Sequence, residues 1–166
     1  AGALPGAVVV GGAVGAGAGM AVGLKRLPLE RIPVAGVLSA SFFGASLVHV
    51  PVGPSSVHLI LNGLAGLVLG WAAFPALFVG LLLQAVFFGF GGFTVLGVNA
   101  LNIAGPAVLT WLIFGQLVAR GSPLSRAVWA ALGGALAIAT TTGMVAFSRM
   151  VRGGGVPPAR RGRRAA

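Results

Sequence analysis

The sequence consists mainly of apolar runs that are separated by charges, prolines or glycines, and most of them are long enough for a membrane-spanning helix. Roughly 20 residues of α-helix cross a hydrocarbon core about 30 Å thick. We therefore predict an all-α integral membrane protein with a bundle of six transmembrane helices. The predicted spans are Ala3–Leu24, Pro33–Val50, Ser55–Gly70, Ala72–Phe90, Val98–Ala119 and Leu124–Ser148.

The composition supports this fold class. Charged residues make up 7% and hydrophobic residues 57% of the chain, whereas about a quarter of the residues in ordinary soluble domains are charged. The chain has 11 Lys and Arg residues and a single acid, Glu30, which gives a formal net charge of +10. Because these bases flank hydrophobic segments and do not define a basic surface, we do not expect nucleic-acid binding.

The residues needed for the common kinds of catalysis are missing. The chain has no cysteine, one acid and two histidines, so the usual hydrolytic and redox arrangements cannot be assembled. It also has no Gly-rich phosphate loop followed by a lysine. We predict that the protein is not an enzyme, that any ATPase is a separate chain, and that any metal is bound by nitrogen or oxygen.

The basic residues indicate a topology. If every run crosses, the loop with Lys25, Arg26 and Arg31 and the loop with Arg120 and Arg126 lie on one side, which the positive-inside rule makes cytoplasmic. This predicts a multi-pass protein of the cell (inner or plasma) membrane with an extracytoplasmic N-terminus. The bases after Ser148 then lie outside, which conflicts with the positive-inside rule. Either the last run does not cross the membrane, or a seventh helix is absent from this chain, and we favour the second explanation. Residues 1–150 are predicted to form the bundle and residues 151–166, rich in Arg, Gly and Pro, a disordered tail.

One polar stretch, HVPVGPSSVHLILNGLAG (His49 to Gly66), interrupts the apolar pattern. The prolines and glycine of PVGP are expected to end one helix, and the two serines after them, including Ser56, to cap the next. This places His58 in the first helical turn, where a neutral imidazole would suit a divalent transition metal. The alternative is an imidazole bonded to a neighbouring carbonyl. His49 is a further metal candidate, with an interfacial position as its alternative.

A second polar stretch runs from Gln84 to Val108. A glycine-rich uncharged loop precedes Asn99 and Asn102, which open the following predicted helix. With Gln84 and Ser56, these side chains are candidates to orient a ligating imidazole by hydrogen bonding. Hydrogen bonds between helices are the alternative. The numerous glycines are expected to pack helices closely, and part of their surface is a candidate docking face for another membrane subunit.

At these two stretches the sequence resembles the CbiM/NikM family, the membrane substrate-binding (S) components of cobalt and nickel energy-coupling-factor (ECF) transporters. The resemblance rests on PVGPSSVHL at Pro51–Leu59, LLLQA at Leu81–Ala85 and GFGGFTVLGVNALN at Gly89–Asn102, in the order and spacing of the family. Together these motifs cover about a third of the chain. Lesser agreement extends from Leu4 to Ser148.

The resemblance implies a bundle of seven helices whose pocket opens to the outside and captures Co²⁺ or Ni²⁺ as the transported substrate, for example for cobalamin biosynthesis. The implied ligands are the N-terminal amine, an N-terminal Met-His dipeptide and the histidine matching His58. This chain begins with AGALPG and does not contain Met-His.

The resemblance also implies partners: a transmembrane coupling (T) subunit, a pair of cytoplasmic ATPases and a small accessory membrane subunit, all at the lipid bilayer. The alternative functions are a structural or assembly subunit without its own ligand and a stand-alone channel. The channel is the weaker alternative, because the sequence shows no ring of charged residues and no carbonyl-rich selectivity filter.

Overall fold

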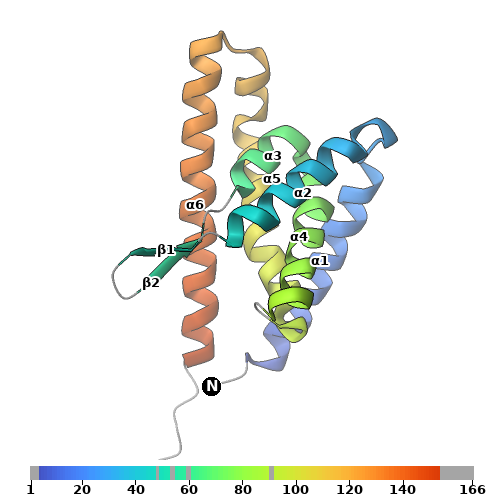
Figure 1. Cartoon of the computed structure of the whole chain (residues 1–166), viewed down its shortest axis with the longest axis vertical. Coiled ribbons are helices and arrows are strands. Elements are labelled where there is room, and N and C mark those ends of the chain that lie inside the picture. The colour runs from blue at the N-terminus through green and yellow to red at the C-terminus, as the bar shows by residue number, and fades with distance from the viewer. Residues whose placement is uncertain (1–3, 48, 53–54, 59–60, 90–91, 154–166) are drawn as a thin grey trace, which may run out of the picture.

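The computed structural model describes residues 4–47, 49–52, 55–58, 61–89 and 92–153, and it describes no side chains for residues 49–52, 55–58 and 152–153. The described part contains α-helices, three 3₁₀ turns and one β-hairpin (Figure 1). The elements are α1 (Gly6–Lys25), η1 (Leu29–Arg31), α2 (Ile32–Leu47), β1 (His49–Val52), β2 (Ser55–His58), α3 (Asn62–Leu69), η2 (Gly70–Ala72), α4 (Ala73–Phe88), η3 (Phe93–Val95), α5 (Leu96–Arg120) and α6 (Pro123–Gly153).

The predicted class, a helical membrane bundle, is confirmed. Four segments of the described chain are long and apolar enough to cross a membrane: Gly6–Lys25, Asn62–Phe88, Phe93–Arg120 and Pro123–Val151. α2 has 16 residues and is therefore only about 24 Å long, less than the thickness of the hydrocarbon core. The part of the predicted tail beyond Gly153 lies outside the described residues, whereas its first three residues continue α6.

α3 runs parallel to α5. Its first residue, Asn62, bonds the carbonyl of Ile103, whereas Gly66 packs against Ala107 one turn further along both helices. At the end of α3 the chain turns at Gly70, which has a φ of 59°, a backbone conformation that suits glycine. α3 has only 8 residues, fewer than half of the roughly 20 that cross a membrane, and it starts at the middle of the bundle.

α4 returns in the opposite direction. Phe74, near its start, packs against Gly19 of α1, and Phe88, at its end, lies 5.9 Å from Phe43 of α2, measured between ring centroids. The apolar stretch Asn62–Phe88 is thus folded back on itself at η2 and does not form one straight span (Figure 1).

The span predicted from Ser55 to Gly70 is wrong in its first half. Ser55–His58 forms strand β2, and the helix begins at Asn62. The physical reason lies in the local sequence: Pro51 and Pro54 disfavour helix, and a Gly-Pro dipeptide is typical of turns between extended segments. Ser55 and Ser56 therefore do not cap a helix, and His58 is not in a first helical turn.

Glycines allow the close helix packing that the sequence predicts. A Cβ added to Gly12 would overlap Val98 of α5, and one added to Gly66 would overlap the carbonyl oxygen of Ala107. In the other direction, a Cβ on Gly97 would lie 2.7 Å from the Cα of Ala13 in α1. In contrast, a Cβ on Gly17 would have no neighbour within 4 Å, so only part of the glycine surface is used inside the bundle.

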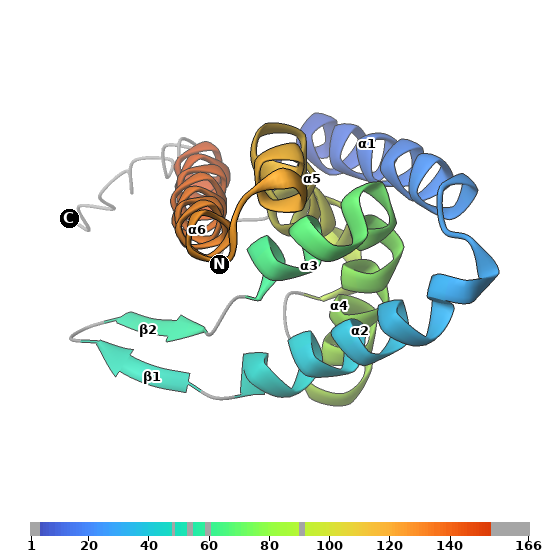
Figure 2. The same cartoon turned by 90° about the horizontal axis from the view of Figure 1, so that it is seen from above.

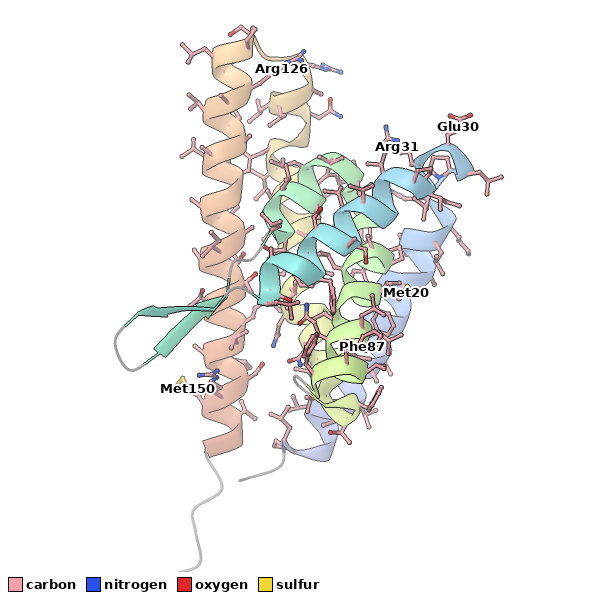
Figure 3. The ribbon with its side chains drawn as sticks, in the orientation of Figure 1. Met20, Glu30, Arg31, Phe87, Arg126 and Met150 are labelled. Atoms are coloured by element: carbon pink, nitrogen blue, oxygen red, sulfur yellow. The ribbon has the colours of Figure 1, made fainter. Side chains whose placement is uncertain are left out.

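The two basic loops lie at the same end of the bundle, as predicted. Arg31 and Arg126 are at one end and Met150 at the other (Figure 3), and the N-terminus lies at the Met150 end (Figure 1). α6 has 31 residues, or about 46 Å of helix, and runs between the two ends. The last run is therefore long and apolar enough to cross a membrane, and a seventh helix stays a prediction.

Two glycine-to-alanine substitutions separate packing from helix propensity. We expect Gly66→Ala to destabilise the fold by about 1–3 kcal/mol, because the added methyl group meets a backbone carbonyl that cannot rotate away. Gly17→Ala should be neutral or stabilising by up to about 1 kcal/mol, because alanine favours helix and its methyl group meets open space. Thermal unfolding of both variants in one detergent checks this, and equal shifts in melting temperature would contradict the packing shown.

Candidate functional site

The two histidines of the chain lie opposite each other on the β-hairpin. β1 and β2 are antiparallel, and their register pairs His49 with His58 and Val52 with Ser55. The pair therefore lies at the open end of the hairpin, next to the helices that flank it, α2 and α3. The sequence identified both residues as metal candidates but gave no reason to place them side by side. The backbones of His49, His58 and Ser56 are described, and their side chains lie outside the description.

Asn62 fixes the point at which the hairpin returns to the bundle. This first residue of α3 is fully buried, and its Nδ2 donates to the carbonyl oxygen of Ile103 at 3.0 Å and to Oγ1 of Thr141 at 2.8 Å. One side chain thus connects α3, α5 and α6, four residues after His58. Because a carbonyl oxygen only accepts hydrogen bonds, the bond to Ile103 fixes which end of the amide is the nitrogen.

The other end of this amide has no partner. Oδ1 of Asn62 is buried without a hydrogen bond, and leaving a buried acceptor unpaired costs about 1–3 kcal/mol. Such an atom provides an acceptor for an N–H or O–H group that enters the interior beside the hairpin. In the sequence Asn62 is a polar residue in an apolar run, and this is the signal that could have identified it.

Gln84 is buried on α4, with 8% of its surface exposed, and its Nε2 also has no hydrogen-bond partner. The Oγ of Ser39 on α2 is also buried without a hydrogen-bond partner. The two helices pack closely, because a Cβ on Gly80 of α4 would lie 3.3 Å from the backbone oxygen of Ser39. Unpaired buried polar atoms therefore occur on α2, α3 and α4, the helices that surround or follow the hairpin.

Asn99 and Asn102 lie elsewhere, at the end of the bundle that holds the N-terminus. They line a cavity of about 250 Å³ between the start of α5 and the end of α6, together with Ser148 and Arg149. Nδ2 of Asn102 donates to Oγ of Ser148 at 3.2 Å, which is the interhelical bond that the sequence left as an alternative. The guanidinium of Arg149 makes this cavity unfavourable for a metal cation.

No complete metal site is formed by the described side chains. Among them there is no group of three or more His, Cys, Asp or Glu residues that could hold an ion. The structure therefore brings His49 and His58 together through the hairpin register and tethers the hairpin through Asn62. Asn99 and Asn102 instead line the cavity between the start of α5 and the end of α6.

Comparison with known proteins gives the family. The family model described as "CbiM: Cobalt uptake substrate-specific transmembrane region" matches residues 1–157. A relative from Haemophilus influenzae, whose name refers to metal transport, is 47% identical over 148 residues, or 89% of this chain and 72% of that protein. The "Fused nickel transport protein NikMN" of Rhodobacter capsulatus is 41% identical over 83 residues, which are 48% of this chain and 24% of that protein.

Solved structures support the fold. The crystal structure of a truncated transition metal transporter superposes with a TM-score of 0.67 at 24% identity, over 83% of this chain and 69% of that one. A second transition metal transporter gives a TM-score of 0.64 at the same identity, over 83% of this chain and 65% of that one. Because the family model covers nearly the entire sequence, this multi-pass membrane chain belongs to the family of cobalt-uptake substrate-specific transmembrane components.

Proposed function

We propose that the chain is the substrate-binding membrane subunit of an ATP-driven transition-metal importer of the energy-coupling-factor type, which captures Co²⁺ or Ni²⁺ on the extracytoplasmic side. The observation that carries this proposal is the register of the hairpin, which opposes His49 and His58 next to the buried Asn62. Neutral imidazoles are good donors for both ions, whereas Mg²⁺ and Ca²⁺ prefer oxygen ligands. His58 is the proposed metal ligand, and His49 is the second candidate.

The supporting side chains in this proposal are amides and a hydroxyl. Asn62 holds the hairpin exit, and its free Oδ1 is available to an imidazole N–H, an arrangement that commonly orients a metal-binding histidine. Gln84 and Ser56 remain candidates for the same task. The positions of Asn99 and Asn102 in a separate cavity with Arg149 favour a role at the mouth of the bundle.

The orientation and partners are part of the proposal. The end with Arg31 and Arg126 is cytoplasmic by the positive-inside rule, so the N-terminus is extracytoplasmic in the cell membrane. Because the sequence lacks a phosphate-binding loop, ATP hydrolysis requires separate cytoplasmic ATPases and a transmembrane coupling subunit, and a small accessory subunit completes the complex. The division into residues 1–150 as bundle and residues 151–166 as tail also stays a prediction.

Metal binding to the full-length protein in detergent tests the role of His58. We expect Ni²⁺ or Co²⁺ to bind measurably by isothermal titration calorimetry, and His58→Ala to weaken binding at least about tenfold, since one lost ligand removes more than about 1.4 kcal/mol. His49→Ala should have a smaller effect. Unchanged metal affinity in His58→Ala would rule out this site and favour the alternative, an assembly subunit without its own ligand. In an assembly subunit, a polar substitution of the exposed Gly17 would prevent complex formation.

Adjacent threonines on α6 provide a matched test of the Asn62 tether. Thr141→Val removes the acceptor of the bond from Asn62, and we expect it to cost about 0.6–1.7 kcal/mol of stability and to weaken metal binding several-fold. Within the described part of the chain, Oγ1 of Thr140 bonds only the carbonyls of Leu136 and Ala137 in its own helix, so Thr140→Val should change neither quantity appreciably. Equal metal affinity in the two variants would show that the tether does not support the site.

A further inference from the structure

An apolar groove lies on the outer surface of the bundle between α1 and α5, which pack side by side (Figure 2). It has a volume of about 390 Å³. Gly105 on α5 leaves open space, because a Cβ there would have no neighbour within 4 Å. Gly15 and Gly19 on α1 are covered by the side chains of Leu101 and Phe74, which also line the groove. The groove opens toward the lipid, since Leu112 at its rim is 57% exposed.

Positive charge lies at one end of this groove. Trp71 lines the groove, and the guanidinium carbon of Arg26 lies 5.6 Å from the centroid of the Trp71 ring. Lys25, the last residue of α1, precedes Arg26 directly. Glu30 is the only acidic side chain in the chain, so this end of the bundle carries an excess of positive charge.

The size of the groove distinguishes two possible occupants. One turn of α-helix, about 10 Å wide and 5.4 Å long, occupies roughly 400 Å³, so the groove would hold about a single turn of a partner helix. A lipid chain is much thinner and can lie along the groove, whose lining extends from Gly15 to Val22 on α1 and from Leu101 to Leu112 on α5. Tryptophan is typical of the membrane interface, where the phosphate of a lipid lies, and cationic side chains there attract anionic lipids.

We propose that this groove is a binding site for one anionic phospholipid. An acyl chain lies between α1 and α5 over Phe74, and Trp71 marks the level of the glycerol backbone. Lys25 and Arg26 hold the phosphate and the anionic headgroup. The site is separate from the hairpin and the histidines, so it can be tested without reference to metal transport.

Native mass spectrometry of the full-length protein in detergent tests the proposal with phosphatidylglycerol and phosphatidylcholine of the same acyl chains. We expect phosphatidylglycerol to bind more tightly, and each of Lys25→Gln and Arg26→Gln to weaken it about fivefold. The double variant should lose the preference. Arg126→Gln, which removes a base at the same end whose guanidinium bonds the carbonyls of Gly121 and Ala119, is the control and should retain it.

A second pair of variants tests the apolar part. Ala18 lines the groove and is exposed, so Ala18→Phe should fill it and weaken the binding of both lipids. Ala21 is exposed on the same helix outside the groove lining, and Ala21→Phe should leave binding unchanged. Equal binding of the two lipids, or an unaltered preference in the double variant, would overturn the proposal.

Crosslinking in native membranes distinguishes a lipid from a protein partner. A photoreactive amino acid at position 18 should give an adduct with phospholipid, detected by the mass of the purified chain. An adduct with another protein subunit would identify the groove as a protein interface and would also overturn the proposal.

Discussion

The structure depends on one requirement of the bilayer, that polar groups inside it be satisfied by protein. The amide nitrogen of Asn62 meets this requirement at the middle of the bundle, where it joins α3 to Ile103 of α5 and Thr141 of α6. Because α3 starts there and not at the membrane surface, its first turn needs such partners. These bonds anchor the start of the short helix α3 inside the bundle.

Close helix approach is the second condition for this arrangement. Gly66 brings α3 against Ala107 of α5 one turn after Asn62, so the hydrogen bond and the glycine contact act on the same pair of helices. Gly12 and Gly97 do the same for α1 and α5. α5 is thus the central helix of the bundle, and its Gly105 leaves open space in the groove between α5 and α1.

The sequence predicted the fold class and most helices well, because apolar runs bounded by charges or glycines are local signals. It failed at Ser55–His58, where serines after a proline could equally cap a helix or enter a strand. The pairing of His49 with His58 depends on strand register, and the Asn62 bonds join residues 41 and 79 positions apart. Such non-local relations have no periodicity to reveal them. The same applies to Asn102, whose bond to Ser148 distinguished two interpretations that the sequence left open.

The position of the hairpin links the fold to the proposed transport of a metal. β1 and β2 pair only with each other in the described part of the chain. They lie near the middle of the height of α6 (Figure 1) and project away from the helices (Figure 2). A two-stranded ribbon has unpaired N–H and C=O groups along both outer edges, and hydrocarbon cannot satisfy them. Within a membrane, these edges must therefore face water or further protein. A hydrated divalent cation also needs water or polar protein groups around it if it is to reach the middle of the bundle. The surroundings that satisfy the backbone of the hairpin would therefore also admit a metal ion to the two histidines.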